Sequence, residues 1–447
     1  MVFENSRIIE SIEISKLKPA RRNARTHSKL QTSQIAESIR RFGFTNPVLI
    51  DDDNHLIAGH GRVSAASGIG LTEVPCIRLS NMSAADKRAY IIADNKIALN
   101  ADWDPEMLAL EFQELIDLGF DVSLTGFELC EIDQILIDAE GASQDPVRAE
   151  DDHPAPATVA VSRPGDHWIL GPHALVCGDA KDPAVVAQIM GDDLADMVFT
   201  DPPYNVRIDG HVSGLGRTHH REFAEASGEM SKAEFTEFLR LSLGGAANVS
   251  RDGAIAFICM DWRHVGEVLA AGYSAFTELK NICVWAKTNG GMGSFYRSQH
   301  EMVLVWKKGS APHTNTFGLG DKGRYRTNVW TYAGVNTFKS DRMDELASHP
   351  TVKPVALVAD AIRDVSNRGE IILDVFGGSG TTLIAAEKTG RRARLVEIDP
   401  LYCDVIVSRW EKLTGKKALL SGTHQAFEIV RSARAAAKPA SVAKVAL

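Results

Sequence analysis

A strand, turn, helix and strand pattern near the C-terminus constrains the fold more than any other feature of this sequence. The apolar run 371–376 is typical of a strand, residues 377–382 form a glycine-rich turn, and residues 383–387 have a helical pattern. A second strand is expected over residues 393–399, so the pattern predicts a βαβ unit with Glu397 roughly 20 residues beyond the turn, where an acid can reach a ribose diol. The turn lacks the G-x-G-x-x-G spacing of a pyrophosphate site, and no G-x-x-x-x-G-K-S/T loop is present. These patterns favour a nucleoside cofactor without a diphosphate over NAD or ATP.

The tetrapeptide Asp201-Pro202-Pro203-Tyr204 follows the apolar run 196–200. That run predicts a buried strand, so the tetrapeptide is expected at a carboxyl end, where open α/β sheets bind their ligands. Two prolines fix the backbone and remove two N–H donors, which leaves carbonyl oxygens free to accept. A carboxylate, a carbonyl and an aromatic face suit a planar group that carries an NH₂, such as the amino edge of a nucleobase. The alternative is a proline-bearing turn in which Tyr204 is ordinary packing.

Four sequence blocks in a fixed order carry a family resemblance. They are residues 200–205, residues 349–354 (His-Pro-Thr-Val-Lys-Pro), residues 374–382, and residues 397–400 followed by Tyr402. In this order the chain resembles the β-class amino-methyltransferases of DNA over roughly residues 163–420. The resemblance implies a Rossmann-like α/β sheet with permuted motif order, seven mixed strands and helices on both faces. It also implies S-adenosylmethionine as the cofactor.

The resemblance assigns roles to residues of this chain. Asp201, Pro202, Pro203 and Tyr204 are the expected catalytic residues. The expected cofactor-binding residues are Asp179, Lys353, Asp374, Phe376, Gly377, Gly378, Ser379, Gly380, Thr381, Thr382 and Glu397. Among these, Glu397 is expected at the ribose hydroxyls, Lys353 near the methionine part, and Asp179 near the adenine ring. The alternative for Asp179 is a turn residue after a hairpin strand.

The target base follows from the same tetrapeptide. An Asp in first place resembles adenine-modifying members of the family, whereas Ser is common in cytosine-modifying ones, so adenine is predicted and cytosine stays open. Either base lies inside a duplex stack, so it must be extruded, and Tyr204 would offer a replacement stacking surface. Methylation of an RNA base or a protein glutamine amide, and an inactive DNA-binding regulator, are the alternatives.

Two irregular, basic regions are the predicted contacts to double-stranded DNA. Residues 205–230 are expected to form a flexible loop next to the tetrapeptide, although a merely solvated loop is the alternative. Residues 285–345 are the candidate target recognition region. The expected DNA-binding residues are Arg207, Arg217, Arg221, Lys287, Arg297, Arg324 and Arg326, whereas Trp285 and Trp306 are expected in the core. The pair His219-His220 has no third ligand at suitable spacing, so no metal site is predicted.

The N-terminal part forms a different unit. A helix is expected over residues 33–42 and strands over 47–50, 56–58 and 74–77, with the turn Gly59-His60-Gly61-Arg62 leading into a further helix. Residues 7–100 thereby resemble the α+β ParB-like amino-terminal domain. A glycine turn beside an arginine at a helix N-terminus can hold a phosphate of nucleotide or DNA. The second motif of that family is represented at best by Asp94-Asn95-Lys96, so accessory DNA or partner binding is preferred to catalysis.

Composition and charge complete the domain outline. We expect a ParB-like domain at 7–100, a helical extension at 101–139, an acidic linker at 140–162, a methyltransferase domain at 163–425 and a flexible tail at 432–447. The net charge of -9 argues against a non-specific basic DNA binder but allows a local positive face. Six scattered cysteines without a C-x-x-C pair and the lack of a long apolar run predict a cytoplasmic protein without a membrane span. A homodimer is left open.

Overall fold

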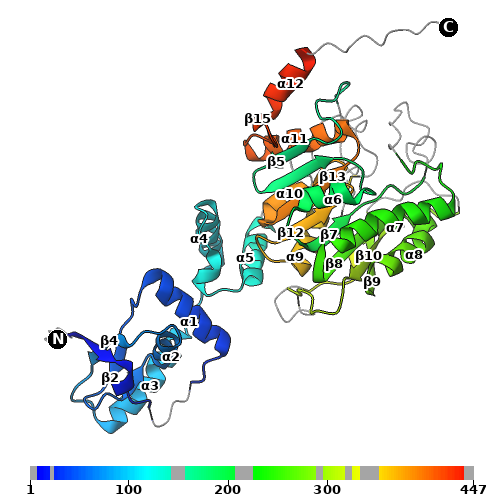
Figure 1. The fold of residues 1–447 in the computed structure, drawn as a ribbon. Coiled ribbons are helices and arrows are strands. Elements are labelled where there is room, and N and C mark those ends of the chain that lie inside the picture. The colour runs from blue at the N-terminus through cyan, green and yellow to red at the C-terminus, as the bar shows by residue number, and fades with distance from the viewer. Residues whose placement is uncertain are drawn as a thin grey trace, which may run out of the picture. The chain divides into compact units, whose positions relative to one another are not determined.

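The computed structural model describes residues 8–20, 25–141, 157–206, 225–287, 295–317, 325–332 and 352–436. The chain divides into two compact units, Met1–Ser143 and Gln144–Leu447 (Figure 1). Four of the expected DNA-binding residues, Arg207, Arg217, Arg221 and Arg324, lie outside the described residues. Most of the expected acidic linker and of the expected tail lies outside them as well.

The first unit contains a four-stranded sheet in the order β1-β4-β2-β3. Its strands are β1 (Ile9–Glu13), β2 (Val48–Ile50), β3 (Leu56–Ala58) and β4 (Glu73–Arg78). Its helices are α1 (Lys29–Phe42), α2 (His60–Gly68) and α3 (Ala84–Ala98). Val48, Ile50 and Val74 lie in a small core between the sheet and α2. Helix α1 begins four residues earlier than its apolar period indicates, because the Ser28 side chain caps it by accepting the Gln31 N–H.

Two further helices follow in the same unit, α4 (Pro105–Asp117) and α5 (Leu129–Gly141). Asp104 caps α4 by accepting the N–H groups of Glu106 and Met107. Phe112 from α4 and Ile132 from α5 share a buried cluster with Val122. This pair of helices therefore has a core of its own, separate from the core of the four-stranded sheet.

The second unit is built on one large sheet. Its described strands are β5 (His167–Leu170), β6 (His173–Cys177), β7 (Ala195–Thr200), β8 (Ser250–Met260), β9 (Glu278–Ala286), β10 (His300–Lys307), β11 (Val329–Thr331), β12 (Ile371–Asp374), β13 (Arg392–Glu397), β14 (Leu419–Leu420) and β15 (Gln425–Ala426). The order is β11-β9-β10-β8-β7-β12-β13-β6-β5-β14-β15. The prediction of seven strands was therefore too low. Strands β9 to β6 in that order are seven, and the other described strands, β11, β5, β14 and β15, extend the two edges.

Helices cover both faces of this sheet, as predicted (Figure 1). The described helices are α6 (Pro183–Met190), α7 (Lys232–Asn248), α8 (Val265–Ala275), α9 (Val355–Val365), α10 (Thr381–Thr389), α11 (Pro400–Thr414) and α12 (Phe427–Ala436). Side chains of α9, α10 and α11 pack in one core with Met197 and Phe199, whereas side chains of α7 and α8 pack in the other with Val198. This alternation follows from the two-residue period of a strand buried on both faces. In the described part of the chain, no helix has the length and apolar character needed to cross a membrane.

The strand directions gather the predicted site at one edge of the sheet. Strands β6, β13, β12, β7 and β8 are mutually parallel, so their carboxyl ends meet at the same edge. Strand β10 is antiparallel to β8 and pairs Met302 with Met260, so the beginning of β10 lies at that edge too. The predicted catalytic and cofactor-binding residues, except Lys353, lie at or shortly after the ends of β6, β7, β12 and β13, and the fold brings these four segments together.

Candidate active site

One pocket at this edge is lined by residues from all four strand ends. Its lining includes Asp179, Asp201, Pro202, Pro203, Tyr204, Lys353, Asp374, Phe376, Gly377, Gly378, Ser379, Thr381, Thr382 and Glu397. Every expected catalytic residue lies in this lining, and so does every expected cofactor residue except Gly380. The structure therefore brings together residues that are more than two hundred positions apart along the chain, such as Asp179 and Glu397.

The tetrapeptide is held rigidly after β7. Asn205 is buried with a left-handed φ of 51°. Its side chain donates to the Met230 carbonyl at 2.8 Å and accepts the N–H groups of Gly228 and Met230 at 3.1 and 3.2 Å. Pro202 is buried, and no residue in the described part of the chain donates to its carbonyl. The Asn205 hydrogen bonds fix the backbone directly after Tyr204. They thereby help to fix the direction of the Asp201 carboxylate and the Pro202 carbonyl.

Asp374 lies beneath the glycine-rich loop. Its carboxylate accepts the Thr382 hydroxyl at 2.6 Å, the Thr200 hydroxyl at 2.9 Å and the Phe376 N–H at 3.0 Å. Burial raises the pKa of Asp374 to about 7, against these three bonds, which lower it. Asp374 thus ties the end of β7 to the loop and to the start of α10.

Glu397 closes the loop from the neighbouring strand. Its carboxylate accepts the N–H groups of Gly378 at 2.7 Å and Asp399 at 2.8 Å. Burial raises the pKa of Glu397 to about 7. Gly378 and Gly380 have φ angles of 51° and 84°, a region that favours glycine. The loop backbone therefore faces the pocket without a side chain at Gly378, whereas Gly380 lies against Ile406.

The opposite wall begins at the end of β6. Asp179 accepts the Lys181 N–H at 2.8 Å, and the Lys181 ammonium pairs with Glu225 at 2.6 Å. Phe238 of α7 packs against Phe376 with ring centroids 5.7 Å apart. Glu225 and Phe238 line the pocket but were not predicted, because nothing in the sequence near them marks a site. An acid at each end, a glycine loop and aromatic walls form a lining whose chemistry fits an adenosyl group.

Lys353, which was expected near the methionine part of the cofactor, contacts the tetrapeptide. Its ammonium lies 2.5 Å from an Asp201 oxygen, 3.1 Å from the Tyr204 hydroxyl and 3.0 Å from a Glu301 oxygen. Although burial would lower it, Asp201 and Glu301 raise the pKa of Lys353. Burial raises the pKa of Asp201 despite the neighbouring lysine, and the pKa of Tyr204 rises as well. Lys353 lines the pocket, but its charged contacts are with the tetrapeptide and with Glu301.

Glu301, at the start of β10, is the main residue of this region that was not predicted. It is 7% exposed and also pairs with Lys287. The only sequence signal is an acid at the head of the apolar strand 302–306, which by itself indicates no site.

The three described residues among the expected DNA contacts differ in their surroundings. Lys287 pairs with Glu301, and Arg297 directly follows Phe295 and Tyr296 in the sequence, two aromatic residues that are 87% and 81% exposed. Arg326 instead bonds with Asp364 at 3.0 Å, Tyr332 at 3.1 Å and Asp360 at 3.4 Å, contacts that favour a structural role over the predicted DNA contact. Trp285 and Trp306, 3% and 0% exposed, are core residues as predicted.

A second pocket lies within the first unit, around the predicted glycine turn. It is lined by Arg25, His27, Gln31, Ile35, Ala58, Gly59, His60, Gly61, Arg62, Asp94 and Asn95. Gly59 precedes α2 with a left-handed φ of 99°, and Arg62 donates to the Asn46 carbonyl at 2.6 Å. The weak second motif Asp94-Asn95 therefore lies at the same pocket as the glycine turn, where Arg25 bonds with Asn95 at 3.1 Å.

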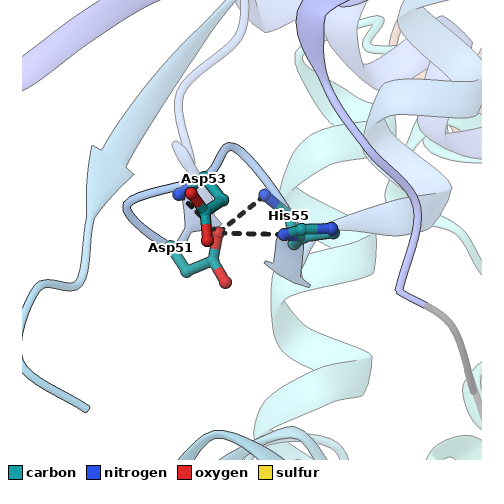
Figure 2. A group of neighbouring side chains, drawn as sticks. All are labelled: Asp51, Asp53 and His55. Atoms are coloured by element: carbon teal, nitrogen blue, oxygen red, sulfur yellow. Dashed lines mark hydrogen bonds and ion pairs between the residues drawn. The ribbon is translucent and has the colours of Figure 1, made fainter.

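Asp51, Asp53 and His55 form a small group of metal-ligand types in the turn between β2 and β3 (Figure 2). The Asp51 carboxylate already accepts the N–H groups of Asp53 at 3.0 Å and His55 at 2.8 Å, and Lys87 pairs with it at 2.9 Å. Although burial would raise it, these bonds hold the pKa of Asp51 at about 2. The group closes a turn, and we propose no metal there.

Comparison with known proteins agrees with this two-part organisation. Residues 195–408 match a DNA methylase family, residues 106–164 a ParB-methyltransferase HTH domain, and residues 2–95 a ParB N-terminal domain. The HTH match covers α4 and α5. The chain combines a DNA methylase region at residues 195–408 with an N-terminal ParB-like domain, and the methyl donor is S-adenosylmethionine.

Two relatives and one solved structure are among the proteins to which parts of this chain are similar. The ParB-like nuclease domain-containing protein YnaK of Escherichia coli K12 is 49% identical over 75 residues, 17% of this chain and 86% of YnaK. The type II methyltransferase M2.DpnII of Streptococcus pneumoniae is 28% identical over 231 residues, 50% of this chain and 84% of its own length. The structure of the PvuII DNA methyltransferase, cytosine-N4-specific, aligns with a TM-score of 0.41 and 14% identity over 59% of this chain and 94% of that chain.

Proposed function

We propose that this protein transfers a methyl group from S-adenosylmethionine to the exocyclic amino group of adenine in double-stranded DNA. One observation carries the proposal. The Asp201 carboxylate and the glycine loop held by Glu397 line one and the same pocket. An amine site and a nucleoside site are both needed for such a transfer, and a binding module has no use for the pair.

The chemistry asks the tetrapeptide to activate a poor nucleophile. The lone pair of an exocyclic amino nitrogen is delocalised into the ring. Hydrogen bonds from its two N–H groups to Asp201 and to the Pro202 carbonyl favour a pyramidal nitrogen with a localised lone pair. The bound cofactor supplies an electrophilic methyl group on a sulfonium. Positioning and electrostatics by Asp201 and Pro202 then provide most of the acceleration.

The lining of the cofactor site divides into tasks. Glu397 offers a carboxylate for the ribose hydroxyls, and Phe376 and Phe238 offer flat apolar surfaces for the adenine ring. Gly378 brings backbone close to the ligand, while Asp374 keeps the loop in place from below. Asp179 lies at the far wall, where its carboxylate can accept from the adenine amino group.

The choice of adenine over cytosine rests on the Asp in first place of the tetrapeptide. The experiment is transfer of a labelled methyl group to unmethylated duplex DNA, followed by digestion and mass spectrometry of the nucleosides. N6-methyladenine supports the proposal, whereas N4-methylcytosine corrects the base and keeps the chemistry. Absence of any labelled nucleoside with saturating cofactor would contradict methyl transfer to DNA.

The ParB-like unit is proposed to bind a phosphate of DNA or nucleotide as an accessory function. The support is a pocket that joins Arg25, His27 and Arg62 to a glycine turn at the N-terminus of α2. Binding of duplex DNA or labelled nucleotide by residues 1–143 at low salt tests this, and no binding of either would refute it. The cytoplasmic location stays a prediction, and the question of a homodimer stays open.

A further inference from the structure

Glu301 is a buried carboxylate beside the tetrapeptide, and the proposed function gives it no task. One of its oxygens, Oε2, lies 3.0 Å from the Lys353 ammonium and 3.0 Å from the Tyr204 hydroxyl. The other, Oε1, bonds with the Lys287 ammonium. Two of these three partners, Lys353 and Tyr204, line the pocket beside Asp201.

Glu301 and Asp201 share the same two donors. Asp201 Oδ2 accepts from Lys353 at 2.5 Å, and Asp201 Oδ1 accepts the Tyr204 hydroxyl at 2.7 Å. A tyrosine hydroxyl has one proton, so it can donate to only one of the two carboxylates at a time. The ammonium has three protons and can serve both carboxylates at once.

The target amino group competes for these acceptors. In the proposed function, the substrate N–H must approach an oxygen of Asp201 that is already engaged by Tyr204 or Lys353. Glu301 Oε2 is the alternative acceptor for both donors and is already within hydrogen-bond distance of each. The Tyr204 hydroxyl can therefore turn its hydrogen bond from Asp201 to Glu301 without any large movement, and it keeps its proton.

We propose that Glu301 is a positioning residue for methyl transfer, which takes over the Tyr204 hydroxyl and shares the Lys353 ammonium so that Asp201 is free to accept the target amine. This inference rests on the proposed methyl transfer, and Glu301 acts through Tyr204 and Lys353 without touching the substrate.

The charges of the cluster agree with this role. Two carboxylates, Asp201 and Glu301, are matched by two ammonium groups, Lys353 and the half-buried Lys287, so the charges of the cluster balance. Without Glu301, the charge of the Lys353 ammonium would be balanced by Asp201 alone. The ammonium would then stay bound to the Asp201 carboxylate, which the target amine needs as its acceptor. Although burial would raise it, Lys353 and Lys287 keep the pKa of Glu301 at about 2. A carboxyl that stays ionised is a poor proton acceptor, which favours positioning over proton removal.

The test is Glu301→Gln, which keeps the size of the side chain and removes its charge. We expect single-turnover methyl transfer to fall by about 100-fold, the scale of a misplaced catalytic group, with cofactor affinity unchanged. Glu278→Gln is the matched control, because Glu278 is an exposed glutamate of the neighbouring strand that pairs with Lys280. It should transfer methyl groups at the wild-type rate.

The pH profile separates positioning from a structural role. Burial raises the pKa of Asp201, and the charge of Glu301 raises it further. Removal of that charge should therefore move the acid limb of the rate profile to lower pH, even though the maximal rate falls. A structural defect would lower the rate without this shift. In a Lys353→Met background, Glu301→Gln should cost far less than in the wild type, because its partner is gone.

The outcomes are distinct. Wild-type rates or an unshifted acid limb in Glu301→Gln would overturn the inference while the proposed function stands. No transfer by the wild-type chain would refute the proposed function first. If Glu301→Gln does not fold, Glu301→Asp takes its place as a test of position alone, because it keeps the charge but withdraws the carboxylate oxygen from Tyr204. A slowed Glu301→Asp supports the positioning role, and a wild-type rate overturns it.

Discussion

Two glycines of the cofactor loop allow a prediction of stability from geometry alone. A Cβ at Gly380 would lie 3.1 Å from Cγ1 and 3.2 Å from Cγ2 of Ile406, whereas a Cβ at Gly378 would meet nothing closer than the Phe376 carbonyl at 3.9 Å. Both residues have a positive φ, 84° for Gly380 and 51° for Gly378. Alanine at either position therefore carries backbone strain, but only Gly380→Ala also crowds the core.

The magnitudes follow from these contacts. Left-handed backbone costs an alanine about 1–2 kcal/mol. Overpacking against a buried branched side chain adds about 1–3 kcal/mol. We expect Gly380→Ala to lower the free energy of unfolding by about 2–5 kcal/mol and Gly378→Ala by about 1–2 kcal/mol.

Urea unfolding followed by tryptophan fluorescence measures this difference. Of the 7 tryptophans, all except Trp103 belong to the unit Gln144–Leu447, so the signal reports the methyltransferase unit. Gly378→Ala is the matched control, with the same chemical change in the same loop. Equal destabilisation by the two substitutions would refute the argument from Ile406 packing.

Three further predictions use other parts of the site. Because burial raises the pKa of Asp374 from 3.8 to about 7, the folded state holds a proton that the unfolded state loses, so stability from this group is full below pH 4 and falls as the pH rises to 7. The free energy of unfolding, measured by urea titration, should fall by at most about 1.4 kcal/mol per pH unit in this range. Asp374→Asn should flatten this dependence on pH, and an unchanged slope in the variant would contradict the assignment. Asn205→Ala removes three hydrogen bonds that hold the tetrapeptide and should destabilise the methyltransferase unit by about 2–4 kcal/mol and slow methyl transfer, with unchanged activity as the contrary result. Arg297→Ala should reduce the slope of log affinity for DNA against log salt concentration by about one, the value for one phosphate contact. An unchanged slope would show that Arg297 does not contact a DNA phosphate.

The sequence predicted the parts of this molecule that have strong local patterns. The apolar runs before Asp201 and Gly377 became β7 and β12, and their directions bring the two segments to one pocket. Buried parallel strands leave continuous apolar runs, so this part of the fold is readable without a structure.

The remaining features depend on contacts between distant residues. Glu301 meets Tyr204 across 97 positions, and Lys353 meets Asp201 across 152, separations that leave no periodic trace. The number of strands was missed for a related reason. Strands β14 and β15 have 2 residues each, too few for an alternating pattern to be recognised.

The central claim is that Asp201 activates an amino group of DNA beside the bound cofactor. Single-turnover transfer of a labelled methyl group to duplex DNA by wild type and Asp201→Ala, with cofactor affinity measured for both, tests it most directly. We predict a fall of about 100-fold or more in the transfer rate, the scale of losing one preorganised partner of the transition state, with the cofactor still bound. Full activity of Asp201→Ala would contradict the account.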